Sequence, residues 1–426
     1  MQTKQDRDLH QSSRRDSGLS LPRQETCDAL VLDAQLRQSL VTVRSLGSRG
    51  LRVAAMETFN GVPAFWSRWC QRAFVCPTDG KAETYLAALE QILEQANVRV
   101  LITSSNATVE LLRQHREKLE KRVCIALSKD PALGIALHKE LTLEVAKEQG
   151  LCIPRAITIR SESEVATALH EIGLPAVIKP VESWIWGEQA AIGLASKLVV
   201  TTQEAQHAVA DMTQHGIAVL FQQFLSGRRE AMHLFYAHGQ FYASFAQWAK
   251  RTAPPLGGTS VLRQSIAIPK DIGDQAKRLI QAIDLEGYSE VEFRRDSAGI
   301  PYLMEINPRL SASVELAVRA GIDFPYLLYQ WANGDQIPRV KSYKTGEWMR
   351  YLRGDVATTC AALLQHGRPG ITPPYQTLLD FGASFLVPMR YDYFDWKDPL
   401  PALTAAFDFT HYLAQLSGKK LFKRES

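Results

Sequence analysis

Two acidic side chains near residue 300 are spaced to hold a metal ion between them. The strings "EVEFRRD" and "IPYLMEIN" flank a short turn and are predicted to pair as an antiparallel hairpin. If Ala298 and Gly299 form the centre of the turn, Glu292 lies directly opposite Glu305. Facing like charges destabilise a sheet, so a positive partner is expected between them.

Two further polar residues extend this pattern. Asn307 lies two residues beyond Glu305, on the same face of the strand, and Arg309 follows just past the strand end. Two carboxylates and an amide oxygen suit Mg²⁺ that keeps other positions for phosphate oxygens, and Arg309 would meet the phosphate charge. The alternative is a solvated edge hairpin whose acids pair with Arg294, Arg295 or Arg309, because a turn slipped by one residue would separate the carboxylates.

An apolar strand that ends in a cation precedes the hairpin. In "AVIKPVESWIWG" the strand ends at Lys179, and Trp184 and Trp186 follow where a glycine-rich phosphate loop would be expected. The strand belongs either to a nucleotide site with an altered lid or to an ordinary core. The two indoles either close over the site and exclude water or serve as core contacts.

Hydrophobic periodicity indicates which helices and strands carry these residues. From Asp28 to about residue 128, short apolar runs such as "DALVLDA" and "LRVAAME" alternate with helical stretches, which predicts a parallel sheet covered by helices. One amphipathic helix is expected before Gly150, followed by strands and a helix that lead to "AVLFQQFLSG". From Glu230 to Ile268 the pattern changes to antiparallel strands.

Composition limits the class of protein. A chain of 426 residues suggests two or three domains, and a net charge of +4 without a concentrated basic stretch argues against nucleic acid. The six cysteines are scattered, as expected in a reducing cytoplasmic setting. No apolar run approaches the roughly 20 residues that cross a membrane, so a soluble protein is expected. Residues 1–26 are predicted to be a disordered tail, with an organelle-targeting segment as the alternative.

The string "MEINPRLSASVELAVRAGIDFP", with "VEF" upstream, resembles the ATP-grasp superfamily, and within it the carboxylate-amine ligases and the carbamoyl-phosphate-synthase type. The resemblance implies an α/β and α+β fold, in which a Rossmann-like N-terminal domain precedes a two-subdomain ATP-grasp fold. The implied parts are the N-terminal domain at 27–128, a lysine and lid subdomain at 129–220, a metal-binding subdomain at 221–334 and a C-terminal extension at 335–426.

The resemblance also assigns roles to residues around ATP and its metal. Glu292, Glu305 and Asn307 match the ligands of Mg²⁺, for which Mn²⁺ is a substitute, and Arg309 matches the arginine at the γ-phosphate and reacting carboxyl. The residues expected at the nucleotide are Lys139, Lys179 and Ser183 at the phosphates, Gln223, Phe224 and Leu225 around adenine, and Glu230 at the ribose. Arg263 is expected to hold the acyl substrate, with Arg251 as a second candidate.

The activity that the resemblance implies is ATP-dependent joining of a carboxylate to an amine through an acyl phosphate, with release of ADP and phosphate. The alternatives are a carboxy-phosphate-forming enzyme, a small-molecule kinase of the same fold, or a non-catalytic ATP-binding protein. The partners expected are a small carboxylate and an amine, with neither nucleic acid nor membrane. Dimerisation, which is common among such proteins, is an expectation.

Overall fold

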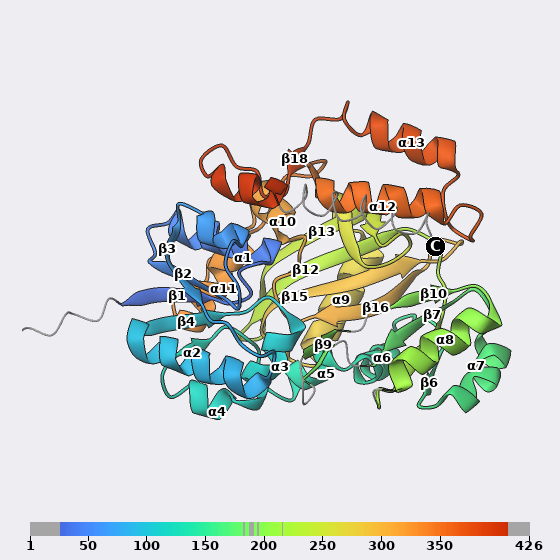
Figure 1. The fold of residues 1–426 in the computed structure, drawn as a ribbon, viewed down its shortest axis with the longest axis horizontal. Helices are drawn as coiled ribbons and strands as arrows, with labels where there is room; N and C mark the ends of the chain where they lie inside the picture. The colour runs from blue at the N-terminus through green and yellow to red at the C-terminus, as the bar shows by residue number, and fades with distance from the viewer. Residues whose placement is uncertain (1–25, 182–183, 187–190, 194–195, 215, 408–426) are drawn as a thin grey trace, which may run out of the picture.

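The computed structural model describes residues 26–181, 184–186, 191–193, 196–214 and 216–407. Within these ranges the chain forms sheets of five, four and seven strands and one two-stranded ribbon (Figure 1). The predicted tail, apart from residue 26, lies outside the described residues, as do Ser183 and the side chains of Trp184 and Trp186.

The five-stranded sheet is parallel, as the alternating pattern predicts, with strand order β3-β2-β1-β4-β5. Its strands are β1 (Cys27–Val31), β2 (Val53–Glu57), β3 (Cys70–Val75), β4 (Val98–Ile102) and β5 (Cys124–Ile125). The connecting helices are α1 (Arg37–Gly47), the 3-10 turn η1 (Pro63–Trp66), α2 (Ala82–Ala96), α3 (Asn106–Gln114) and α4 (Arg116–Leu119). All five residues of β1 are buried, because helices cover both faces of the sheet.

The four-stranded sheet is antiparallel, in the order β10-β7-β11-β6. Its elements are β6 (Ala156–Ile159), η2 (Glu162–Glu164), α7 (Val165–Ile172), β7 (Ala176–Pro180), β10 (Lys197–Val199), α8 (Thr202–Thr213) and β11 (Val219–Gln223). The separate ribbon pairs β8 (Trp184–Trp186) with β9 (Ala191–Gly193).

Two helices precede this sheet where the sequence predicted one. They are α5 (Ala132–Leu137) and α6 (Lys139–Glu148). The helix breaks because His138 is extended, with φ −100° and ψ 113°, and its imidazole accepts a hydrogen bond from the backbone N–H of Leu141. Lys139 is therefore the first residue of α6.

The seven-stranded sheet has the order β16-β15-β12-β13-β14-β17-β18. Its strands are β12 (Arg229–Ala237), β13 (Gln240–Ala253), β14 (Thr259–Ile266), β15 (Gly287–Arg295), β16 (Pro301–Asn307), β17 (Trp348–Arg350) and β18 (Arg390–Tyr391). Its helices are α9 (Lys270–Ala282), α10 (Val314–Ala320), α11 (Phe324–Asn333), α12 (Leu352–Leu364) and α13 (Pro374–Ala383). The predicted C-terminal extension thus supplies two strands to the edge of this sheet.

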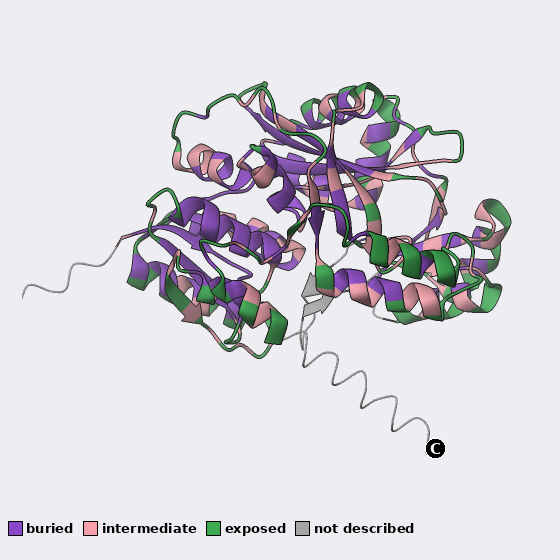
Figure 2. Cartoon of the chain, turned by 90° about the horizontal axis from the view of Figure 1, so that it is seen from above, coloured by how far each residue is buried: buried purple, intermediate pink, exposed green. Residues whose placement is uncertain are grey.

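One apolar cluster joins the five-stranded sheet to the seven-stranded sheet through α1, α10 and α11. All eleven residues of α1 are buried, which explains why the cluster is continuous across the two sheets (Figure 2). No helix in the described part of the chain is long and apolar enough to cross a membrane.

Candidate functional site

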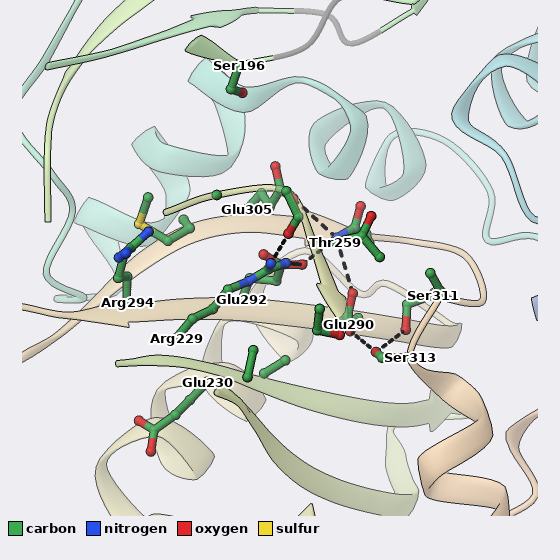
Figure 3. Close-up of a pocket in the computed structure, with 18 of the residues that line it drawn as sticks. Ser196, Arg229, Glu230, Thr259, Glu290, Glu292, Arg294, Glu305, Ser311 and Ser313 are labelled. Carbon is green, nitrogen blue, oxygen red and sulfur yellow. Dashed lines mark hydrogen bonds and ion pairs between the residues drawn. The ribbon is translucent and has the colours of Figure 1, made fainter. Parts of the chain in front are cut away.

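A cavity of about 300 Å³ lies where β7 of the four-stranded sheet faces β12, β15 and β16 of the seven-stranded sheet. Most of the charged side chains that line it come from β12, β15 and β16, and they converge from neighbouring strands (Figure 3). The charged residues of the lining are Lys179, Arg229, Glu230, Glu290, Glu292, Arg294, Glu305 and Arg309.

The register of the hairpin β15–β16 places Glu292 opposite Glu305, as predicted. The pairing near the turn is shifted by one residue from the prediction, because Arg295 faces Pro301 and Phe293 faces Leu303. A β-bulge at Met304 absorbs this shift, since the register changes between Glu292 and Phe293. The bulge restores the predicted pair and brings Met304, next to Glu305, into the lining of the cavity.

A third carboxylate, that of Glu290, joins the predicted pair. The amide nitrogen of Asn307 lies 3.4 Å from a carboxylate oxygen of Glu290, 3.5 Å from Glu292 and 3.4 Å from Glu305. Glu290 also accepts a hydrogen bond of 2.9 Å from the Ser313 hydroxyl. Sequence reasoning missed Glu290, although its position two residues before Glu292 on the same strand face was a usable signal.

Arg229 supplies the positive partner that the facing carboxylates require. Its guanidinium forms an ion pair with Glu292 and donates a hydrogen bond to the Gly258 carbonyl. Arg229 begins β12, where Ala231 is the residue opposite Glu292, so the side chain reaches its partner diagonally across the strands. Sequence reasoning missed this arginine.

Burial and charge determine how the carboxylates ionise. Burial raises the pKa of Glu292 to about 8, because the attraction of Arg229 does not outweigh the loss of water and the repulsion from Glu305. Burial acts in the same direction on Glu305, but the cations of Lys139 and Lys179 outweigh it and lower the pKa of that carboxyl. The pKa values of the two facing carboxyls thus shift in opposite directions.

The two predicted phosphate lysines both approach this cluster. Lys179 lies near the end of β7, is 8% exposed and lines the cavity, and burial lowers its pKa to about 8. Lys139 is also buried, and its ammonium donates to the Val181 carbonyl over 3.4 Å. The break before α6 thus brings its first residue to the strand end that carries Lys179.

Arg309 lines the cavity and connects it to the five-stranded sheet. Its guanidinium donates to the side-chain oxygen of Asn106, at the start of α3, and lies 3.4 Å from the side-chain oxygen of Asn307. Asn106 was missed by sequence reasoning, because nothing in its local pattern relates it to a residue some two hundred positions away.

The carboxylate of Glu230, which is predicted to bind the ribose, is held by ion pairs. Because side chains alternate along a strand, Arg229 faces the carboxylate cluster, while the carboxylate of Glu230 points to the opposite side of the strand (Figure 3). There it pairs with Arg295 at 2.6 Å and with Arg228 at 3.2 Å. Glu230 also lines the cavity, and its assignment to the ribose stays a prediction.

Arg263 also lies away from its predicted position at the acyl substrate. It is completely buried in β14, and two of its nitrogens donate to the carboxylate of Asp392 at 3.0 and 2.5 Å. Arg251, the second candidate, is held by Asp355 at 2.5 and 2.7 Å. Both arginines have structural ion pairs, so neither is available to a substrate carboxylate in this arrangement.

The predicted adenine segment follows β11. The backbone N–H of Gln223 donates to the Arg155 carbonyl at 2.8 Å, and Leu225 is buried. The guanidinium of Arg294 lies over the ring of Phe224, 5.6 Å from its centroid. The assignment of Gln223, Phe224 and Leu225 to adenine stays a prediction.

The donor set fits a magnesium ion in its chemistry. The carboxylates of Glu292 and Glu305 are hard-oxygen ligands, and Glu290 adds a third. Asn307 directs its amide nitrogen at these carboxylates and its amide oxygen at Arg309, so its oxygen would bind a metal after the amide group turns over. Among the described residues no three acidic, histidine or cysteine side chains are already arranged around one metal position. The ion pair between Arg229 and Glu292 is one reason, since it occupies an oxygen that a metal would use.

Comparison with known proteins shows likeness to a protein family and to a curated relative. A family model described as "ATP-grasp in the biosynthetic pathway with Ter operon" matches residues 249–354. D-alanine--D-alanine ligase B of Pseudomonas putida is 28% identical over 218 residues, which cover 46% of this chain and 64% of that protein. The chain thus spans less than two-thirds of the length of this curated relative.

Solved structures match over more of the chain. N5-carboxyaminoimidazole synthetase from Staphylococcus aureus has a TM-score of 0.60 at 15% identity, covering 85% of this chain and 98% of that one. L-amino acid ligase from Bacillus licheniformis has a TM-score of 0.57 at 18% identity, covering 72% and 75%. At these identities the likeness concerns the fold alone.

Proposed function

We propose that this chain, which has the ATP-grasp fold and so confirms the resemblance found in its sequence, is an ATP-dependent ligase that joins a carboxylate to an amine. The observation that carries the proposal is the convergence of three carboxylates and Asn307 with Lys179 and Arg309 in one cavity. This combination suits a triphosphate and its metal. The relatives named as ligases support the proposal.

The residues proposed for each role follow from the geometry. Glu292, Glu305 and Asn307 would hold Mg²⁺, which, when bound, neutralises charge on the transferring phosphoryl group. Nothing in the site supports Mn²⁺ in place of Mg²⁺. Lys139 and Lys179 would neutralise the phosphate oxygens at the opposite wall of the cavity.

The proposed reaction has two steps. A carboxylate oxygen of the first substrate attacks the γ-phosphorus of ATP, the bond to the β–γ bridging oxygen breaks, and ADP leaves. The amine nitrogen then attacks the carbonyl carbon of the acyl phosphate, and the carbon–oxygen bond to phosphate breaks after the amine loses a proton. The products are the amide, ADP and phosphate, and no covalent bond to the protein forms.

Arg309 is proposed to orient the reacting groups. Its contacts with Asn106 and Asn307 hold the guanidinium at the junction of the cavity with the N-terminal sheet. There it can bind the carboxylate and later the oxyanion of the tetrahedral intermediate. The pockets for the acid and the amine would lie on the side of the cavity that faces the N-terminal sheet, near α3.

The test measures ADP release from Mg-ATP by the full chain across a matrix of carboxylates, each with and without an amine, followed by mass spectrometry. The expected result is ADP only with a particular pair, together with a product lighter by one water than their sum. ADP release that depends on bicarbonate would favour a carboxy-phosphate-forming enzyme, and a stable phosphorylated product would favour a kinase. ATP binding without turnover across the matrix would favour a non-catalytic ATP-binding protein. Homodimerisation and a cytoplasmic location remain predictions.

A further inference from the structure

Arg229 forms an ion pair with the carboxylate cluster, and its position raises a question that the proposed function does not answer. It lines the cavity but contacts Glu292, an oxygen ligand that Mg²⁺ would need. The side chains of this pair are 19% and 9% exposed, so water screens their attraction only weakly. A metal ion and Arg229 therefore compete for one carboxylate.

A second arginine occupies the position that pairs with Arg229 on the neighbouring strand. Arg229 on β12 faces Arg294 on β15, and facing like charges destabilise a sheet unless an anion lies nearby. Arg294 donates to the Leu256 carbonyl at 2.6 Å, and no ion pair with a carboxylate is found for it within the described part of the chain. Of the two arginines, only Arg229 has a carboxylate partner among the described residues, and that partner is Glu292.

We propose that Arg229 is an exchangeable counter-ion, which leaves Glu292 when a divalent metal binds and then pairs, together with Arg294, with a phosphate of the nucleotide. A metal arriving alone would strand a largely buried guanidinium without a partner, which is costly. A metal arriving with a nucleotide supplies both the cation for Glu292 and the anion for the two arginines. Metal and nucleotide therefore bind cooperatively, and the free protein holds metal weakly.

The proposal rests on the proposed function, because it takes the cavity as the Mg-ATP site, yet it makes a separate claim about one residue.

Arg228 provides a matched control. It is the adjacent arginine, and it pairs with Glu230 on the opposite side of the strand. Replacing it changes the same charge without touching the carboxylate cluster.

The experiment measures Mn²⁺ binding to the full chain without nucleotide, by electron spin resonance of the free ion, and Mg-ATP binding by calorimetry. Arg229→Gln is expected to bind Mn²⁺ at least about tenfold more tightly than the wild type and Mg-ATP about tenfold more weakly. Arg294→Gln is expected to weaken Mg-ATP binding without tightening Mn²⁺ binding. Arg228→Gln is expected to match the wild type in both measurements.

Unchanged or weaker Mn²⁺ binding by Arg229→Gln, with normal Mg-ATP binding by the wild type, would overturn this inference and leave the proposed function standing. A wild-type protein that binds no Mg-ATP would overturn both. If Arg229→Gln fails to fold by circular dichroism, Arg229→Lys replaces it. Its shorter side chain retains the charge, so a smaller gain in Mn²⁺ affinity is expected, and the absence of any gain would overturn the inference.

Discussion

Arg263 and Asp392 form an ion pair in which both side chains are almost completely shielded from water, at 0% and 1% exposure. Asp392 also pairs with Arg37 of α1 at 2.5 Å. One carboxylate from the C-terminal extension therefore connects the seven-stranded sheet to a helix of the N-terminal sheet. Arg263, which the sequence suggested for substrate binding, has a structural role here.

Replacing Asp392 with Asn is expected to destabilise the protein strongly. The change leaves Arg263 and Arg37 buried without their carboxylate, which costs about 3–5 kcal/mol of the free energy of unfolding. Urea denaturation followed by circular dichroism measures this loss. Asp395→Asn is the control, because Asp395 pairs with Arg319 where both side chains are more than one-fifth exposed, and about 1 kcal/mol or less is expected. Equal losses in the two variants would contradict the structural role of Asp392.

Replacing Glu305 with Gln is expected to lower substrate-dependent ADP release by about 100-fold or more, because a charged ligand of the metal is lost. Glu290→Gln tests the carboxylate that sequence reasoning missed, and a smaller but clear loss is expected. Glu286→Gln is the control, because Glu286 does not line the cavity and pairs with the exposed His238. This variant is expected to retain wild-type turnover. Wild-type ADP release by Glu305→Gln would refute the assignment of the metal site.

Replacing Asn106 with Ala is expected to lower turnover by about tenfold, since a hydrogen bond to a charged group is lost from Arg309. Steady-state kinetics of ADP release provide the measurement. Arg309→Ala should lower turnover further, while thermal melting should show both variants folded. If Asn106→Ala retains full activity, the contact has no role in positioning the arginine.

The stability of the protein is expected to depend on pH through His233. This imidazole is completely buried, Nδ1 lies 2.7 Å from the Tyr288 hydroxyl, and burial lowers its pKa from 6.5 to about 4. Between these values the unfolded chain binds a proton that the folded chain excludes, so stability falls as the pH decreases from about 6.5 to about 4. The loss through this residue is about 3 kcal/mol at most.

Urea midpoints measured from pH 7.5 to pH 4 test this dependence. His233→Gln cannot take up a proton, so its midpoint should fall less steeply over that range than the wild-type midpoint. Parallel curves for the two proteins would show that another group causes the loss. Above about pH 6.5 neither protein should lose stability through this position.

The sequence alone determined the parts of the site that depend on local periodicity. Glu292, Glu305 and Asn307 share one face because strand side chains alternate, and the short turn sets which residues meet. The prediction of their pairing was confirmed although the turn slipped by one residue, because the bulge at Met304 compensated. The parallel sheet at the N-terminus was predictable for the same reason, since its alternation of strands and helices is a local pattern.

Which charged groups face the cavity, and which are neutralised elsewhere, follows from the tertiary structure and not from the local sequence. Arg229 and Glu230 are adjacent, yet their side chains point to opposite sides of one strand. An alignment to a family motif that is displaced by one residue would therefore exchange their roles. Arg263 pairs with Asp392, and Arg309 contacts Asn106, through segments far apart in the chain. Such partners are set by how the sheets pack, because electrostatic contacts depend on distance in space and not on separation along the sequence.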